Sequence, residues 1–413
     1  MDELTFKDLF GDNPKNLQYK RRIVEHIIEN GPNTLPFLSK VLDISVPTTS
    51  KLVNELMDVK LLKNYGKLET TGGRHPYLYG LNTEGFYFLG VDMSNTDVSI
   101  ILINLVGTQI QEEMNIPFKF ANTEECLEEL CRIINDFIDN KCTVPRKEMV
   151  SIGINVFGRI NPTTGYSYTN FNFWDRPLAA HFTDELGIPT FIDNDTRASA
   201  FGEYMMHYSH EGKKNLLFIN ATWGLGLGLI IDGEPYNGKS GFSGEFGHIH
   251  AYKNEILCHC GKKGCLETEA SGSAMLRKFK ERVEAGDNSI LLDPMGPYKL
   301  TLDEVTMDDL IDATQNEDIL CIEILEDIGE KLGHHIASLI NIFNPHVVVI
   351  GGPMAGTGIY LIQALRGAIR KYSLNMVNQD SELKQSLLMR YAGVMGASLL
   401  ARKKSLARLR EID

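Results

Sequence analysis

Residues 241–267 read GFSGEFGHIHAYKNEILCHCGKKGCLE, and the rest of the chain can be interpreted outward from this stretch. It holds Cys258, Cys260 and Cys265 within eight positions, and the glycines at 261 and 264 permit the tight turns that point thiolates inward. Three thiolates and one imidazole make a tetrahedral zinc site of the structural kind. The alternative is a set of buried thiols without a metal, as free cysteine is often buried. The flanking glycines and lysines favour zinc.

The fourth zinc ligand must be a histidine, and His248, His250 and His259 are the candidates. His259 lies between two cysteine ligands, where closing a ring on the same ion would be strained. We therefore prefer His248. The predicted ligands are His248, Cys258, Cys260 and Cys265.

Two acids frame the same loop, because Glu245 precedes His248 and Glu267 follows Cys265. A metal that folds the loop would draw both carboxylates towards one place. Carboxylates and an imidazole can accept hydrogen bonds from the hydroxyls of a sugar. Each acid taken alone reads as an ordinary solvated side chain, so the hypothesis of a sugar site depends on the zinc loop.

Length and composition limit the number of domains and the cellular compartment that we expect. A chain of 413 residues with 43% hydrophobic residues can form two or three domains. We find neither an apolar run that could span a bilayer nor a secretion signal at the N-terminus. Seven cysteines, three of them in one loop, fit a reducing compartment better than a disulfide framework. We expect a cytoplasmic protein without membrane insertion.

Charge separates the N-terminal part from the remainder. Residues 1–80 hold eleven basic and ten acidic side chains, whereas the whole chain has a formal charge of −13. An acidic body beside a near-neutral N-terminal part would keep nonspecific DNA binding weak and leave DNA contacts to a few placed cations.

The N-terminal part has the pattern of a winged helix-turn-helix. Apolar periodicity predicts helices over 16–29 and 34–42, and Ser45 can cap a third helix that runs to Met57. Strand-like runs at 61–65 and 76–81 predict a wing. The alternative is a small helical module that binds protein. The predicted DNA contacts are Thr48, Thr49, Ser50, Lys51 and Asn54 on the third helix and Arg74 at the wing tip.

The body reads as two lobes. Apolar strands at 86–92, 98–105 and 108–117, a helix at 124–140 and a strand at 150–156 give the order β-β-β-α-β. That order differs from a doubly wound dinucleotide fold and is typical of the ribonuclease-H-like lobe of actin-like sugar kinases. Strands within 216–231 and at 347–350 indicate a second, related lobe. We expect an α/β chain with a DNA-binding domain over 1–82, a first lobe over 83–200 completed by a helix at 394–413, and a second lobe over 201–393 with the zinc loop and an oligomerisation surface.

The zinc loop resembles the signature of the ROK family (repressors, open reading frames and kinases). The matching residues are Glu245-x-Gly-His248 followed by Cys258-x-Cys260-Gly-x-x-Gly-Cys265-Leu-Glu267. Together with the N-terminal part, nearly the whole chain resembles the family's repressors for xylose, N-acetylglucosamine and glucose-type regulation. This resemblance implies operator DNA as a partner, a sugar or sugar phosphate as effector, and a homodimer or homotetramer.

The resemblance also implies a sugar site. The family's kinases use an Asn-Asp pair that opens a helix, and Asn194 and Asp195 match it within IDNDTRASAFGE. Asp195 would then be the general base, although on its own it reads equally well as a helix cap. Phe157 replaces a proline of the kinases in the turn beside the sugar. The implied sugar contacts are Asn155, Asn170, Asn194, Asp195, Glu245, His248 and Glu267.

The nucleotide loops depart from the family's kinases. The first loop lacks both glycines in Asp92-Met93-Ser94-Asn95-Thr96, the second carries Trp223 before Gly224, and the third reads Gly351-Gly352-Pro353. In such loops the backbone must approach the phosphates of the nucleotide closely, so a side chain in place of glycine obstructs phosphate binding. We therefore expect no productive ATP binding, and Asp195 would be a vestigial base. The degenerate loop residues are Asp92, Asn95, Thr96, Trp223, Gly224, Gly351 and Gly352.

These observations predict a sugar-responsive transcriptional regulator that acts as a repressor. One alternative is an active ATP-dependent sugar kinase of the hexokinase or glucokinase kind with an added DNA-binding domain. A second alternative is a regulator controlled by a protein partner that docks near the zinc loop.

Overall fold

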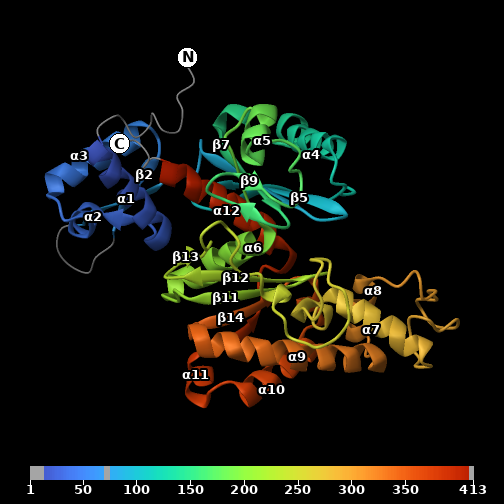
Figure 1. Cartoon of the computed structure of the whole chain (residues 1–413). Helices are drawn as coiled ribbons and strands as arrows, with labels where there is room; N and C mark the ends of the chain where they lie inside the picture. Colours follow the sequence, from blue (N-terminus) through green and yellow to red (C-terminus); the bar gives the residue numbers. More distant parts are fainter. Residues whose placement is uncertain (1–13, 69–74, 409–413) are drawn as a thin grey trace. The chain divides into compact units, whose positions relative to one another are not determined.

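The computed structural model describes residues 14–68 and 75–408, and these form two compact units (Figure 1). The first unit contains the described residues up to Asp195 together with those from Val394 onward, and the second runs over Thr196–Gly393. The division falls after Asp195 rather than after residue 200, because α6 (Asp195–Glu203) packs on the sheet of the second unit. Among the helices in the described ranges, none has the length and apolar character needed to cross a membrane.

The N-terminal segment, residues 14–68 and 75–81, contains helices and short strands in the expected order. Thr34 and Ser45 cap the second and third helices, because their side chains accept hydrogen bonds from the backbone N–H groups of Phe37 and Thr48. The strand order is β1-β3-β2, so a short strand joins the expected pair. The elements are α1 (Pro14–Asn30), β1 (Asn33–Thr34), α2 (Leu35–Leu42), α3 (Val46–Asp58), β2 (Leu62–Lys67) and β3 (Tyr77–Leu81).

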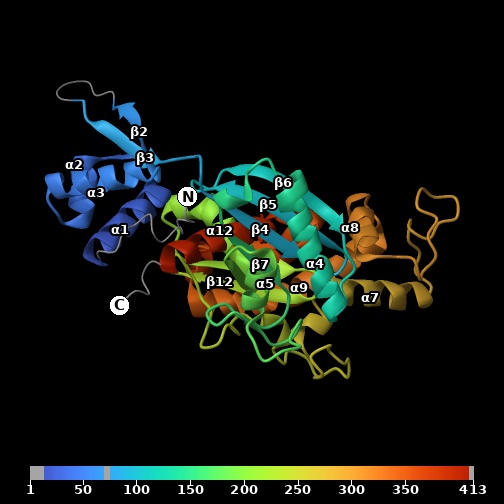
Figure 2. The same cartoon turned by 90° about the horizontal axis from the view of Figure 1, so that it is seen from above.

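The sheet of the first lobe has the strand order β10-β7-β4-β5-β6. β4, β5 and β6 pair antiparallel, while β4, β7 and β10 pair parallel. Figure 2 shows α4 lying across the strands of this sheet. The chain after α4 continues as a π-helical turn at Phe137–Lys141. The elements are β4 (Tyr87–Met93), β5 (Asp97–Asn104), β6 (Gln109–Pro117), α4 (Glu124–Asp136), β7 (Met149–Val156), β8 (Ile160–Asn161), β9 (Tyr166–Ser167), α5 (Leu178–Leu186) and β10 (Thr190–Asn194).

The C-terminal helix α12 (Ala392–Ala407) covers the other face of this sheet. Leu89 and Val91 of β4 pack with α4 and α5 in one apolar cluster. Successive side chains of a strand point to opposite faces, so Gly90 faces away from that cluster. Gly90 pairs with Gly153 on β7, and a β-carbon at either would overlap backbone atoms of α12. The paired glycines therefore let α12 lie directly on the sheet.

The second unit is built around a sheet with the order β13-β12-β11-β14-β15. On one face, Leu217 and Val348 pack in an apolar cluster that includes residues of α9 and α10. On the other face, Gly228 of β12 leaves room for Ala200 of α6. The elements are β11 (Leu216–Ala221), β12 (Leu225–Ile231), β13 (Glu234–Pro235), α7 (Gly272–Glu284), α8 (Met307–Gln315), α9 (Ile319–Phe343), β14 (Val347–Gly351), α10 (Ile359–Tyr372), α11 (Asn375–Asp380) and β15 (Glu382–Gln385).

The two sheets share one topology. Numbered along the chain within each unit, both have the strand order 3-2-1-4-5, with the first three strands antiparallel and the last two parallel to the first. The prediction of two related α/β lobes is confirmed by this repeat.

Candidate functional site

The predicted metal loop folds as a hairpin. An antiparallel bridge pairs His250 with Cys265, and the backbone N–H of Cys258 donates to the carbonyl of Lys262 at 2.8 Å. The turn between these residues needs left-handed backbone, and Gly261 supplies it with φ of 83°. The hairpin brings the cysteines together from both of its arms.

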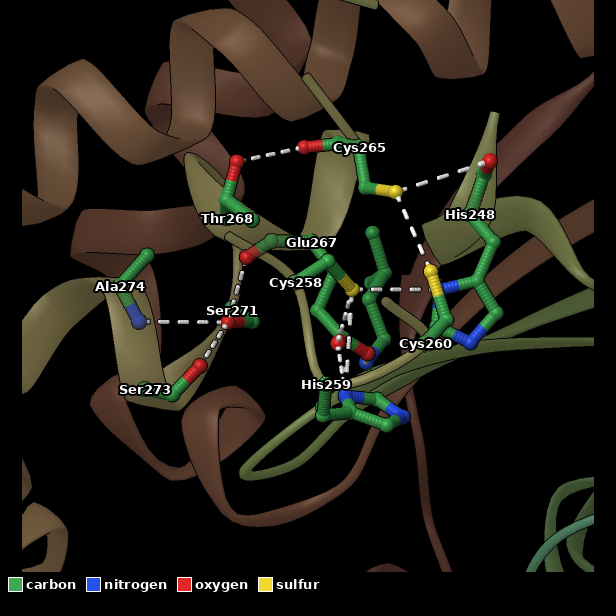
Figure 3. Close-up of polar contacts among 12 residues, drawn as sticks. His248, Cys258, His259, Cys260, Cys265, Glu267, Thr268, Ser271, Ser273 and Ala274 are labelled. Atoms are coloured by element: carbon green, nitrogen blue, oxygen red, sulfur yellow. Dashed lines mark hydrogen bonds and ion pairs between the residues drawn. The ribbon is translucent and has the colours of Figure 1, made fainter. Parts of the chain in front are cut away.

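Four side chains meet at this hairpin, and their ligand atoms all lie within 4.8 Å of one another. The Sγ atom of Cys258 is 3.6 Å from Nδ1 of His248, and the Sγ atoms of Cys260 and Cys265 are 3.6 Å apart (Figure 3). Every cysteine of the chain lies in the described ranges and is a free thiol. The structure thus brings together the four predicted ligands.

The chemistry of this donor set fits a metal. Three sulfur atoms and one imidazole nitrogen are the donors of a tetrahedral structural zinc site. Burial raises the pKa of the Cys258 thiol, so a metal must displace its proton, and affinity should fall in acid. When bound, the ion would cross-link the two arms of the hairpin and fix the residues that follow it.

The other two histidines of the loop lie differently. Nδ1 of His250 is 3.3 Å from the carbonyl oxygen of Lys263. Nδ1 of His259 is 2.7 Å from Oε1 of Glu267, and its imidazole is 70% exposed. His248, His259 and Glu267 also form a group whose ligand atoms lie within 4.8 Å. Both groups include His248, so only one of them can use this side chain for a metal. The first group also has three cysteines, and thiolates are the ligands that favour zinc, so the first group is the better metal site.

Both predicted acids lie beside the cluster. Oε2 of Glu245 is 3.7 Å from Nε2 of His248. Glu267 sits on a buried 3-10 turn, Leu266–Thr268, and its Oε2 accepts a hydrogen bond from the backbone N–H of Leu225 at 3.0 Å. The hairpin therefore holds two carboxylates and an imidazole close together within the second unit.

The Asn-Asp pair lies where β10 passes into α6. The side-chain amide of Asn194 donates to the carbonyl of Gly158 at 3.0 Å and to Oδ1 of Asp195 at 2.8 Å. Lys404 of α12 supports this segment, because its Nζ lies 3.1 Å from Oδ2 of Asp193. Lys404 was not predicted, since 211 residues separate it from Asp193 and no local pattern links them.

The other two predicted sugar contacts are engaged by neighbouring groups. The amide of Asn170 donates to the carbonyl of Phe157 at 2.8 Å. Asn155 is fully buried on β7, and its amide donates to Oδ1 of Asp92 at 3.0 Å. Asn155 therefore supports the first nucleotide-type loop, and its burial removes it from our set of sugar contacts.

The first nucleotide-type loop contains an acid with an unusual environment. Burial raises the pKa of Asp92 to about 7. The hydrogen bond from Asn155 lowers this pKa, and the negative charges of Asp195 and Asp97 raise it further. This carboxyl is therefore partly protonated at neutral pH. The turn that follows contains the exposed residues Asn95 and Thr96.

The second nucleotide-type loop is tied to helix α7. The carbonyl oxygens of Thr222 and Trp223 accept hydrogen bonds from Gly272 and Ser273 at 2.8 and 3.0 Å. The Trp223 side chain is 53% exposed. A β-carbon at Gly224 would lie only 2.7 Å from Oε2 of Glu267. The third loop keeps Gly351 and Gly352 at the end of β14.

The candidate DNA contacts lie mainly on the exposed face of α3. Thr48, Lys51 and Asn54 are exposed, and Ser50 is half-buried. Thr49 is fully buried and its hydroxyl donates to the carbonyl of Ser45 at 3.1 Å, so we withdraw it as a DNA contact. Arg74 lies outside the described residues.

Comparison with known proteins identifies the family. A profile described as "ROK family" matches residues 88–404. The chain is 31% identical over 389 residues to a protein of Caldicellulosiruptor bescii named xylose repressor, covering 91% of this chain and 93% of the relative. The chain belongs to the ROK family.

Two further comparisons bear on this ROK protein. It is 29% identical over 324 residues to a glucokinase of Halalkalibacterium halodurans, which covers 77% of this chain and 96% of the kinase. A crystal structure described as a ROK family transcriptional regulator, homologous to the Escherichia coli MLC protein, superposes with a TM-score of 0.81 at 28% identity, covering 96% of this chain and 98% of the regulator. The regulator thus matches far more of the chain than the kinase does.

Proposed function

We propose that this ROK protein is a sugar-responsive transcriptional repressor whose N-terminal segment binds operator DNA as a winged helix-turn-helix. The observation that carries the proposal is the extent of the similarity. The xylose repressor and the regulator structure cover 91% and 96% of the chain, whereas the glucokinase covers 77%. The additional part includes the three helices and the strand pair found in the described residues 14–68 and 75–81.

The proposed operator contacts come from α3 and the adjacent strands. Helix α3 begins at Val46 behind a serine cap and exposes Thr48, Lys51 and Asn54. A recognition helix uses such residues near its N-terminus to reach base edges in the major groove. Exposed Lys67 on β2 would reach phosphate at the base of the wing.

The proposed effector is a sugar or sugar phosphate. The residues proposed for it form two sets: Asn194 and Asp195 belong to the first unit, and Glu245, His248 and Glu267 belong to the second. Each set carries groups that can bind sugar hydroxyls. Effector binding would favour one arrangement of the units over another and change the spacing of the two DNA-binding segments in a homodimer or homotetramer. Such coupling is typically worth ~1–3 kcal/mol between effector and operator sites.

The hairpin cluster is proposed to hold a structural zinc ion with His248, Cys258, Cys260 and Cys265 as ligands. Operator binding would place the protein in the cytoplasm, where free thiols persist.

Two experiments test the function in sequence. Thermal shift with a panel of sugars and sugar phosphates identifies the effector. Selection of duplexes from a random DNA library, with and without that effector, then yields the operator and its response. A repressor of this kind should select a palindromic site and release it as effector is added. Operator affinity that stays constant across the effector titration would contradict the proposal.

The second candidate is an ATP-dependent sugar kinase, which the glucokinase relative and the presence of Asp195 favour. The side chains in the first loop and Trp223 in the second weigh against it. Coupled turnover of ATP across the same sugar panel decides between them. Turnover that disappears in Asp195→Asn would establish the kinase.

A further inference from the structure

We propose that His259, which is not among the proposed zinc ligands, positions the Glu267 carboxylate for effector binding. The inference rests on the proposed function, because it takes Glu267 to accept hydrogen bonds from a sugar. It assigns a role to an exposed imidazole that neither the metal site nor the hairpin fold requires.

The contact between these two side chains is short. Nδ1 of His259 lies 2.7 Å from Oε1 of Glu267, while the two side chains are 70% and 8% exposed. Figure 3 shows the His259 ring on the same side of the cluster as the Glu267 carboxylate. The imidazole can carry a proton on Nδ1, and the two side chains form an ion pair when the ring is protonated. The exposed ring thus reaches inward to a buried acid.

The second oxygen of the carboxylate is held by the backbone. Oε2 of Glu267 accepts from the N–H of Leu225, and the missing side chain of Gly224 leaves room for it. Each carboxylate oxygen has about two lone-pair sites, so Oε2, which accepts from one N–H group, retains capacity for a sugar hydroxyl. Because both oxygens have a donor, the carboxylate is fixed before a ligand arrives, which lowers the cost of binding.

The neighbouring thiol makes the His259 donor more important. Sγ of Cys258 lies 3.5 Å from Oε1 of Glu267. A Cys258 that binds metal is a thiolate and cannot donate a hydrogen bond. In that state Oε1 of Glu267 loses the S–H donor of Cys258, and Nδ1 of His259 is the side-chain nitrogen that the structure places beside it. The metal hairpin thereby carries the residue that orients the acid.

The experiment compares zinc-loaded full-length chains. His259→Ala removes the donor, and His259→Asn returns an N–H donor on a shorter side chain. His250→Ala is the matched control, because it removes another exposed imidazole from the same hairpin. Isothermal titration calorimetry uses D-xylose, D-glucose, N-acetyl-D-glucosamine and the 6-phosphates of the last two. Zinc content and the unfolding temperature are measured for every variant.

We expect His259→Ala to weaken binding by about fivefold or more, as for loss of a hydrogen bond to a charged group. His259→Asn should recover most of the affinity, and His250→Ala should match the wild type. Zinc content should be the same throughout. A merely structural role would lower the unfolding temperature without this pattern of rescue.

Several results would overturn the inference. Unchanged affinity in His259→Ala, with wild-type binding intact, overturns it and leaves the proposed function standing. An equal loss of sugar affinity in His259→Ala and His259→Asn would also overturn it, because the loss would then come from removing the imidazole ring rather than from removing the N–H group beside Glu267. Loss of zinc in His259→Ala would make His259 a ligand. A wild type that binds none of the probes would overturn the sugar-responsive function, and this inference with it.

Discussion

A pair of glycines decides how closely α12 approaches the first sheet. A β-carbon at Gly153 would overlap the carbonyl oxygen of Ala397, which is backbone and cannot rotate away. Overpacking of this kind typically costs about 1–3 kcal/mol, and more where only backbone can move. We expect Gly153→Ala to lower the unfolding temperature markedly. Gly367→Ala is the control, because that exposed helical glycine has open space around it and should tolerate the change.

The raised pKa of Asp92 predicts a dependence of stability on pH. This pKa rises from 3.8 to about 7 on folding, chiefly through burial. Between about pH 4 and pH 7 the folded chain therefore keeps a proton on Asp92 that the unfolded chain has released. The stability that the protonated Asp92 contributes is complete below about pH 4 and is lost as the pH rises through 7. Asp92→Asn should remove this component, so the variant should gain about 1–3 kcal/mol relative to wild type between pH 5 and 8. Denaturant unfolding at several pH values measures it, and parallel curves would contradict it.

Among the elements, the hairpin shows what a sequence can predict. Spacing alone gave the cysteine cluster, because ligands close in sequence meet wherever the loop turns. Helix caps and apolar periodicity likewise predicted α2, α3 and most strands of the two sheets, whereas β10, β13 and β15 were not predicted. The burial of Thr49 was missed, because a polar residue near a helix start reads as exposed until the neighbouring helices are placed.

Contacts between distant segments could not be predicted from the sequence. Asn155 was expected to bind sugar, but β7 lies beside β4 and turns its amide to Asp92, 63 residues away. The link from Lys404 to Asp193 has the same origin. Strand pairing and helix packing decide which of these distant residues meet, and the residue types alone do not indicate the partner.

At the scale of the hairpin, we predict one zinc ion per chain. Cys260→Ser should reduce the zinc content, because serine replaces a thiolate ligand by a hydroxyl. Cys142→Ser, at a half-buried thiol outside the hairpin, is the control and should keep the metal. Zinc binding free energy contributes to folding, so loss of zinc should also lower the unfolding temperature. Metal analysis with thermal denaturation measures both, and zinc that stays fully bound in Cys260→Ser would exclude it as a ligand.

The distribution of charge over the whole molecule governs how it should bind DNA. The chain has a formal charge of −13, whereas residues 1–80 carry eleven basic and ten acidic side chains. The acidic body repels phosphate, so binding must depend on a few cations of the N-terminal segment. Lys51 is one of these, because its side chain on α3 is 71% exposed.

This dependence can be measured as a salt slope. Each phosphate contact contributes about 0.9 to the slope of log affinity against log salt. Lys51 adds a cation to the proposed DNA-binding face and would neutralise a phosphate whether or not it also reaches a base, so Lys51→Gln should lower the slope for the selected operator by about 0.9. Lys239→Gln removes the same charge from an exposed loop of the second unit and should leave the slope unchanged. Fluorescence anisotropy over a range of salt concentrations compares the three proteins. Equal slopes in wild type and Lys51→Gln would show that α3 does not place this lysine on the DNA backbone. A lower slope in both Lys51→Gln and Lys239→Gln would instead indicate that the net charge of the protein, rather than the position of the lysine, controls binding.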